Sequence, residues 1–250
     1  MSGLASPHVS SARASGEAPA ASPRDPQKQL EQALKAWGGN DDLWVFGYAS
    51  LIWRPEFEFA ESRLARVRGW HRALKMWSRV NRGTPEVPGL VFALLSGGSC
   101  RGVAYRVPRE QASEVLARMW LREMVTDVYD PRWLPCETTT GPVRALGFTL
   151  SRNSPSYTGP MDSHQYRTVF ERASGRYGST IDYVQATGRT LDDHGIRDRT
   201  LHRLLRDYGA IDASRSAGPG PSCAGGAASD SARSAASPWS AAPSDSTDAT

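Results

Sequence analysis

Glu123 is the residue of this sequence whose position most directly suits proton-transfer chemistry. It follows Trp120 by three residues, Met119 by four and Leu116 by seven, so a continuing helix would place it on their apolar face. Burial disfavours a charged carboxylate, and the last turn of a helix adds repulsion from the negative end of the helix dipole. Both effects raise the pKa of a glutamate, and such a carboxyl can take and return a proton near neutral pH.

Two other interpretations of Glu123 stay open from spacing alone. The carboxylate could form a structural ion pair with an arginine of the core. Alternatively, the helix could end earlier and leave Glu123 in solvent.

A second candidate site is the turn Gly47-Tyr48-Ala49-Ser50-Leu51. Successive backbone N–H groups in a tight turn after a strand can bind an anion, and the Ser50 hydroxyl supplies one more donor. Small residues here let a ligand approach the backbone closely. An ordinary turn at the end of a strand is the alternative interpretation.

Weaker motifs favour structural roles. The segment from Gly98 to Gly102 places Cys100 in a GxCxG pattern, but a nucleophile elbow joins a strand to a helix, and here strands are expected on both sides. We therefore predict a hairpin turn between strands at residues 90–95 and 103–107. Asp192, Asp193 and His194 suit a capped turn better than a metal site, and GxGxxG and GxxxxGKS motifs are absent.

The secondary structure predicted to position these residues changes along the chain from mostly strands to mostly helices. Apolar runs predict strands at residues 43–46, 64–77, 90–95, 103–107, 134–139 and 143–150. Helical periodicity predicts helices at residues 27–37, 108–124, 164–173, 181–191 and 197–208. Strands dominate the first part and helices the last, which predicts an α+β fold with an antiparallel or barrel-like sheet.

Composition divides the 250 residues into three parts. Ala, Ser, Pro and Gly make up 18 of residues 1–26 and 29 of the 38 residues 213–250, so we predict disordered tails at both ends. Residues 27–212 hold seven of the eight Trp and every Phe and Tyr, and we predict that they form one domain.

Charge and cysteine usage narrow the classes of partner. Residues 27–212 carry a formal charge of +5, but their arginines are scattered, which favours a solvated surface over nucleic-acid binding and would still suit an anionic small substrate. Three cysteines without CxxC spacing predict neither a disulfide framework nor a zinc site. They are typical of a reducing compartment, and we predict a cytoplasmic protein without a membrane span or export signal.

Four segments of the sequence are informative together: VFGYASLIW at 45–53, RGVAYRVP at 101–108, LREM at 121–124 and SPSYTGP at 154–160. Together they resemble the ChaC family of γ-glutamylcyclotransferases. The resemblance runs from about residue 43 to 208. It implies an α+β fold, a small and mostly antiparallel β-barrel with flanking helices.

The same resemblance implies roles for individual residues. It places the catalytic glutamate at Glu123 and substrate binding at Tyr48, Ala49, Ser50, Leu51, Arg82 and Tyr157. The family loop usually has glycine where this chain has Ala49. If that position has a positive φ, the added methyl group introduces strain of about 1 kcal/mol, and we then expect weaker but not abolished binding.

The implied reaction is cyclisation of the γ-glutamyl group of glutathione, giving 5-oxoproline and Cys-Gly. It needs no cofactor, because the substrate's own α-amino group is the nucleophile. A catalytically silent binding module on the same fold, a cyclotransferase for another γ-glutamyl amine, and a hydrolase using Cys100 are the alternatives. The sequence does not define the oligomeric state.

Overall fold

The computed structural model describes residues 25–124 and 128–209. The chain divides into two units, residues 1–212 and 213–250, and every described residue lies in the first. Both predicted tails lie outside the described residues, apart from the junction at residues 25 and 26. There, helix α1 (Pro26–Trp37) begins behind Asp25, whose side chain accepts hydrogen bonds from the backbone N–H groups of Gln27 and Lys28.

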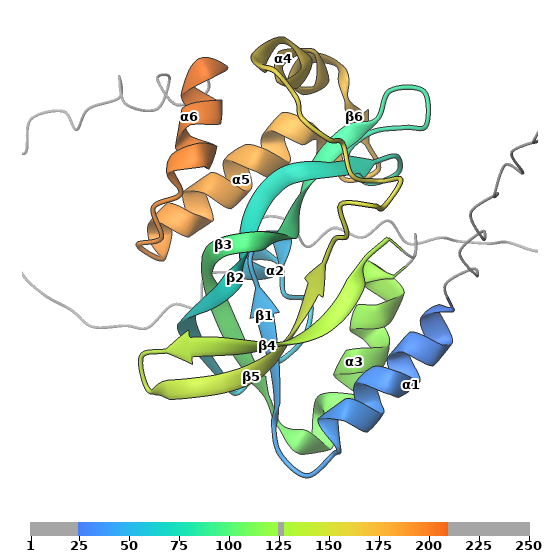
Figure 1. Ribbon diagram of the computed structural model, residues 1–250, viewed down its shortest axis with the longest axis vertical. Helices are drawn as coiled ribbons and strands as arrows, with labels where there is room; N and C mark the ends of the chain where they lie inside the picture. Colours follow the sequence, from blue (N-terminus) through green and yellow to red (C-terminus); the bar gives the residue numbers. More distant parts are fainter. Residues whose placement is uncertain (1–24, 125–127, 210–250) are drawn as a thin grey trace, which may run out of the picture. The chain divides into compact units, whose positions relative to one another are not determined.

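Five strands close into a barrel within the described residues (Figure 1). Their order around the barrel is β1-β3-β2-β4-β5, and every neighbouring pair is antiparallel except β1 and β5, which are parallel. The strands are β1 (Leu43–Gly47), β2 (Glu61–Ser78), β3 (Gly89–Val107), β4 (Asp130–Thr138) and β5 (Gly141–Thr149). The predicted fold class, α+β with a small and mostly antiparallel barrel, is confirmed.

The predicted hairpin around Cys100 is wrong. Residues 90–95 and 103–107 belong to the single long strand β3, which pairs along its length with β2. Gly97 and Gly98, at φ 96° and 73°, form a bulge opposite Gly69 instead of a turn, and the register shifts there between Arg68 and Trp70. Glycines that allow a left-handed backbone serve a bulge as well as a hairpin, so sequence did not separate the two.

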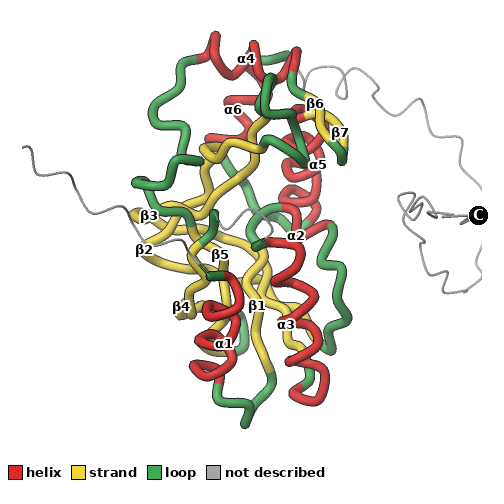
Figure 2. The backbone as a smooth tube through the Cα atoms, turned by 90° about the vertical axis from the view of Figure 1, so that its right-hand side faces the viewer, coloured by secondary structure: helices red, strands yellow, loops and turns green. Residues whose placement is uncertain are grey.

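Helices cover the barrel and the part of the β2–β3 pair that extends beyond it. In Figure 1, α1 and α3 (Arg109–Glu123) lie together at one end, and α4 (Ser163–Arg172), α5 (Thr180–Asp193) and α6 (Arg199–Asp207) lie at the other. The short helix α2 (Ser50–Trp53) lies between α3 and α5 in Figure 2. The strands β6 (Ser174–Gly175) and β7 (Gly178–Ser179) form a separate small hairpin. All five helices predicted from periodicity are present, with ends within a few residues.

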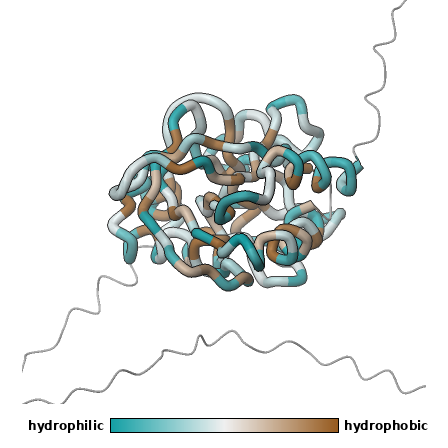
Figure 3. The backbone as a smooth tube through the Cα atoms, turned by 90° about the horizontal axis from the view of Figure 1, so that it is seen from below, coloured by the Kyte–Doolittle hydropathy of each residue, from teal (hydrophilic) through white to brown (hydrophobic). Residues whose placement is uncertain are grey.

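Apolar side chains form the interior that holds these elements. One cluster joins the barrel to α5 and α6 through residues such as Phe46, Tyr105 and Tyr183, and a second joins it to α1 and α3 through residues such as Leu116 and Phe148. The hydropathy colouring in Figure 3 shows brown stretches inside the outline and many teal ones at its edge. No helix within residues 25–124 and 128–209 has the length and hydropathy needed to cross a bilayer.

Candidate active site

Five elements and two connecting segments converge on a pocket of about 290 Å³ beside the barrel. The segment from β1 into α2 contributes four of its residues, and Glu123 contributes the ionisable carboxyl group. The complete lining is Tyr48, Ala49, Ser50, Leu51, Phe92, Glu123, Tyr129, Phe148 and Tyr183. The structure therefore places both candidates from the sequence, Glu123 and the Tyr48–Leu51 turn, around one pocket.

Glu123 is the last residue of α3. The helix buries the stripe that spacing predicted, including Leu116, Met119 and Trp120, and the carboxyl group continues it with a side chain only 15% exposed. Burial raises the pKa of Glu123 above its ordinary value, the charge of Glu56 raises it further, and the neighbouring Arg122 opposes both. The helix does not end before Glu123, so the solvent-exposed alternative is wrong.

Arg122 is relevant to the other interpretation of Glu123, in which its carboxylate forms a structural ion pair. Its Nε lies 3.1 Å from Glu123 Oε1, so an ion pair exists. The same guanidinium also contacts Glu56 Oε2 at 2.7 Å and donates to the carbonyl of Arg54 at 2.6 Å and to Ser50 Oγ at 3.3 Å. Because Glu56 and the α2 segment also satisfy Arg122, its charge does not depend on Glu123 alone.

The turn before α2 presents backbone donors to the pocket. Ser50 and Leu51 open a helix, and the first N–H groups of a helix have no acceptor inside it. Ala49 has φ −145°, which lies far from the left-handed region. The condition for the strain expected at Ala49, a positive φ, is therefore not met.

The hydroxyls of two lining tyrosines, Tyr48 and Tyr129, are linked by hydrogen bonds. Tyr129 donates a hydrogen bond to Tyr48 Oη, which donates in turn to the carbonyl of Phe148 at 3.0 Å. Burial raises the pKa of both tyrosines, and the nearby Glu123 charge raises them further. The two phenols therefore stay neutral and can donate hydrogen bonds near neutral pH.

Sequence reasoning missed four lining residues: Phe92, Tyr129, Phe148 and Tyr183. Phe92 and Phe148 lie on predicted strands and Tyr183 on a predicted helix, where an aromatic residue is indistinguishable from ordinary core. Only Tyr129 carries a weak signal, since it follows Glu123 by six residues in a segment without a helical pattern.

Arg82 and Tyr157 are not among the residues that line the pocket in the described part of the chain. The Arg82 guanidinium lies 5.1 Å from the ring centroid of Tyr183, which does line it, and it donates to the carbonyl of Tyr177. Tyr157 forms an isolated β-bridge with Met76, and Arg152 lies 6.0 Å from its ring centroid. A substrate-binding role for either residue stays a prediction.

Cys100 lies on β3 with an exposure of 3%, and burial raises the pKa of its thiol. A thiol that resists ionisation is a poor nucleophile. It is also absent from the pocket lining among the described residues. The structure therefore gives no support to a hydrolase that uses Cys100.

The barrel and its helices match a class of solved proteins. A yeast γ-glutamylcyclotransferase specific to glutathione superposes with a TM-score of 0.63 at 20% identity, covering 68% of this chain and 96% of the yeast chain. At this identity the likeness shows the fold alone, which is that of the γ-glutamylcyclotransferases.

The family follows from sequence comparison. The ChaC-like protein family matches residues 43–209, and the chain belongs to this family. The glutathione-specific γ-glutamylcyclotransferase of Escherichia coli K12 is 36% identical over 164 residues, covering 65% of this chain and 71% of the relative. Mouse glutathione-specific γ-glutamylcyclotransferase 1 is 35% identical over 159 residues, covering 61% and 71%.

Proposed function

We propose that this protein is a glutathione-specific γ-glutamylcyclotransferase that converts glutathione into 5-oxoproline and Cys-Gly. The observation that carries the proposal is the position of Glu123, a carboxyl group of raised pKa in a pocket that the Tyr48–Leu51 turn also lines. Relatives at 36% and 35% identity bear the name of this activity. The proposal also places the reaction in the cytoplasm, in keeping with three cysteines that lack disulfide spacing.

The reaction forms one bond and breaks one. The α-amino nitrogen of the γ-glutamyl group attacks the γ-carbonyl carbon, and the bond from that carbon to the cysteine nitrogen breaks. The substrate ammonium first loses one proton to become the attacking amine, and the attacking nitrogen loses a second as the ring closes. The departing nitrogen gains one proton to leave as an amine and a second to become ammonium. Glu123 accepts a proton from the attacking nitrogen and passes it to the departing nitrogen, so a single carboxyl serves as base and then as acid and ends the cycle in its original state.

Binding in a folded conformation supplies much of the acceleration. Both reacting atoms belong to the same γ-glutamyl group, so the pocket has to hold that group bent, with the nitrogen close to the carbonyl carbon. Backbone N–H groups at Ala49, Ser50 and Leu51 would hold the substrate carboxylate. The hydroxyls of Tyr48 and Tyr129 would limit the rotation of the γ-glutamyl group. Arg82 and Tyr157 remain proposed contacts to the rest of glutathione.

A cyclotransferase for another γ-glutamyl amine would use the same site, because the chemistry involves only the γ-glutamyl end. The residues that would recognise Cys-Gly decide between the two substrates. A catalytically silent module would bind the same ligand and form no product.

The test is incubation of the full chain with glutathione, γ-glutamyl-alanine and γ-glutamyl-ε-lysine, each followed for 5-oxoproline and the released amine. We expect product from glutathione at a kcat/KM at least about tenfold above that for the other two, a ratio that corresponds to about 1.4 kcal/mol. Equal or better turnover of another amide would replace glutathione as the substrate. No product from any of them, with glutathione still bound in calorimetry, would identify the silent module.

A further inference from the structure

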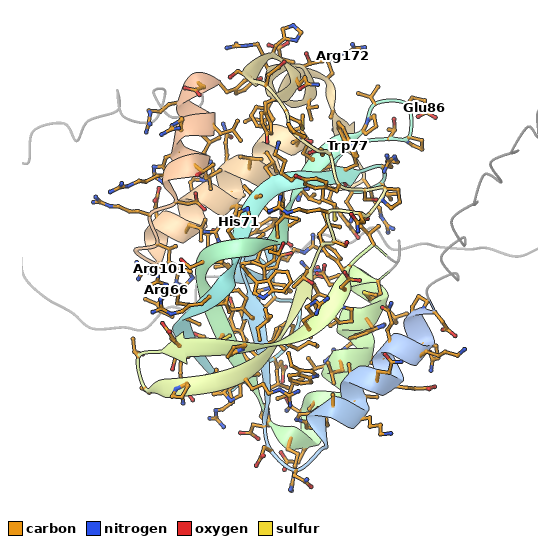
Figure 4. The ribbon with its side chains drawn as sticks, in the orientation of Figure 1. Arg66, His71, Trp77, Glu86, Arg101 and Arg172 are labelled. Carbon is orange, nitrogen blue, oxygen red and sulfur yellow. The ribbon has the colours of Figure 1, made fainter. Side chains whose placement is uncertain are left out.

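Arg72 is a buried arginine that contacts the Tyr48–Leu51 turn but does not line the pocket. Its side chain is only 4% exposed. It extends from β2, where Nη1 donates to the carbonyl oxygen of Tyr48 at 2.6 Å and to that of Arg101 at 3.2 Å. Figure 4 labels Arg101 close to the connection between α5 and α6. Arg72 therefore joins the end of β1 to β3, although it does not line the pocket in the described structure.

A break in the alternation of β2 at Gly69, opposite the bulge in β3, explains why this arginine is buried. Before Gly69 the odd-numbered residues Ala65 and Val67 face the core, and Arg66 and Arg68 are exposed. After the bulge the even-numbered residues Leu74 and Met76 are buried. Gly69, at φ 78°, interrupts the extended backbone, and the two faces of β2 exchange there, so Arg72 turns inward, whereas strict alternation would keep it outside with Arg66 and Arg68.

Asp198 forms an ion pair with the Arg72 guanidinium. Its Oδ2 accepts from Arg72 Nε at 3.0 Å, and its side chain is 17% exposed. Oδ1 of the same carboxylate caps α6 by accepting from the backbone N–H groups of Thr200 and Leu201, each at 3.1 Å. One carboxylate therefore fixes the first turn of α6 and the orientation of the Arg72 guanidinium.

The contact with Tyr48 has a consequence for Ala49. The carbonyl of Tyr48 and the N–H of Ala49 belong to one peptide unit, which is planar, and in a trans peptide the two groups point in opposite directions. A donor that fixes the carbonyl behind the turn therefore fixes the N–H on the pocket side. A charged donor also polarises the peptide, which makes its N–H a stronger donor.

We infer that Arg72, held by Asp198, is a positioning residue that aims the Ala49 N–H at the substrate carboxylate. The inference rests on the proposed function, since it deepens the account of how that pocket binds a γ-glutamyl group. It makes substrate affinity depend on a carboxylate at the start of α6, outside the pocket. Glu123 and the bond-making steps are untouched by this pair.

Asp198→Asn is the most informative variant. Asparagine caps a helix about as well as aspartate, so α6 keeps its first turn, and only the charge that orients Arg72 is lost. We expect KM for glutathione to rise about 3- to 10-fold with kcat within about 2-fold, because a charge-assisted hydrogen bond is weakened without a change at Glu123. Arg72→Lys keeps the charge but lacks the fork that reaches both partners, so a rise in KM of about 10-fold is expected.

Asp162→Asn is the matched control. Asp162 caps α4 through the N–H of Gln165 at 2.8 Å, much as Asp198 caps α6, but its carboxylate forms no ion pair among the described residues. KM and kcat should stay at wild-type values in this variant. Thermal unfolding of all the variants separates loss of fold from loss of affinity.

The experiment measures KM, kcat and melting temperature for wild type, Asp198→Asn, Arg72→Lys and Asp162→Asn with glutathione. A rise in KM confined to the Asp198 and Arg72 variants, in proteins that melt near wild type, supports the inference. An unchanged KM in Asp198→Asn, or an equal rise in Asp162→Asn, overturns it. If wild type itself makes no 5-oxoproline, the proposed function fails first, and this inference fails with it.

Discussion

Glu123 and Glu137 are the same side chain in two different regions of the molecule, and their acidities move in opposite directions. Each lies against an arginine, Glu123 at 3.1 Å from Arg122 and Glu137 at 2.5 Å from Arg68. Burial raises the pKa of Glu123, whereas the hydrogen bond from Arg68 lowers the pKa of Glu137, whose side chain is exposed on β4. An arginine neighbour therefore does not decide the acidity of a carboxyl, since desolvation can outweigh it.

The largest effect on activity is expected from Glu123→Gln. Glutamine keeps the volume but cannot transfer a proton, so kcat should fall by about 10² to 10⁴ fold. Arg122 keeps Glu56 and the carbonyl of Arg54 as partners, so the variant should melt near wild type and still bind glutathione. Turnover assays with thermal unfolding check this, and a folded variant with the wild-type rate would remove Glu123 from the mechanism.

A smaller effect is expected from Ala49→Val, which changes the pocket without changing its carboxyl. The branched side chain adds bulk where the substrate approaches the backbone of the turn, so KM should rise by about tenfold or more, by steric exclusion. Ala49→Gly is the control and should bind as wild type, because φ at this position needs no glycine. Normal glutathione binding by the valine variant would show that the turn does not contact the substrate.

The stability of Glu123→Gln should depend on pH differently from that of wild type. A carboxyl whose folded-state pKa is raised favours folding while protonated, below its unfolded pKa, and this contribution is lost as pH rises through the folded pKa. Glu123→Gln, which stays neutral, should therefore gain stability relative to wild type as pH rises from about 4 toward 7. Urea unfolding at both pH values measures the difference, and a relative loss of stability on raising the pH would contradict the assignment.

The smallest effect is expected from Glu137→Gln. A lowered folded-state pKa contributes stability above the unfolded pKa, and this is lost as pH falls through the folded pKa, so any destabilisation should be confined to neutral pH. The pair is exposed, so its contribution is small and should shrink in high salt. Activity should be unchanged, and a fall in kcat similar to that of Glu123→Gln would erase the distinction between the two regions.

How much the sequence predicts depends on how local each signal is. The position of Glu123 follows from helical spacing within α3, and the turn before α2 follows from small residues after an apolar strand. Barrel closure, by contrast, brings Phe92, Tyr129 and Phe148 to the pocket from separate elements, and nothing in their local sequence marks that convergence.

The bulge between β2 and β3 limits sequence reasoning in a second way. Gly97 and Gly98 carry the signal of a turn, and only pairing with Gly69 shows that the strand continues. Opposite this bulge, the left-handed Gly69 exchanges the faces of β2, and Arg72 turns inward. A one-residue event set by tertiary pairing therefore hides both the long strand and the buried arginine.

Burial holds the Glu123 carboxyl ready to exchange a proton, and a titration of that carboxyl is the most direct test of this role. Carbon-13 NMR of the glutamate side-chain carboxyls, assigned with Glu123→Gln and Glu137→Gln, follows both groups across pH in one sample of the full chain. We expect a titration midpoint for Glu123 above the ordinary glutamate pKa of about 4.3 and a midpoint for Glu137 below it. A midpoint for Glu123 at or below that of Glu137 would contradict it.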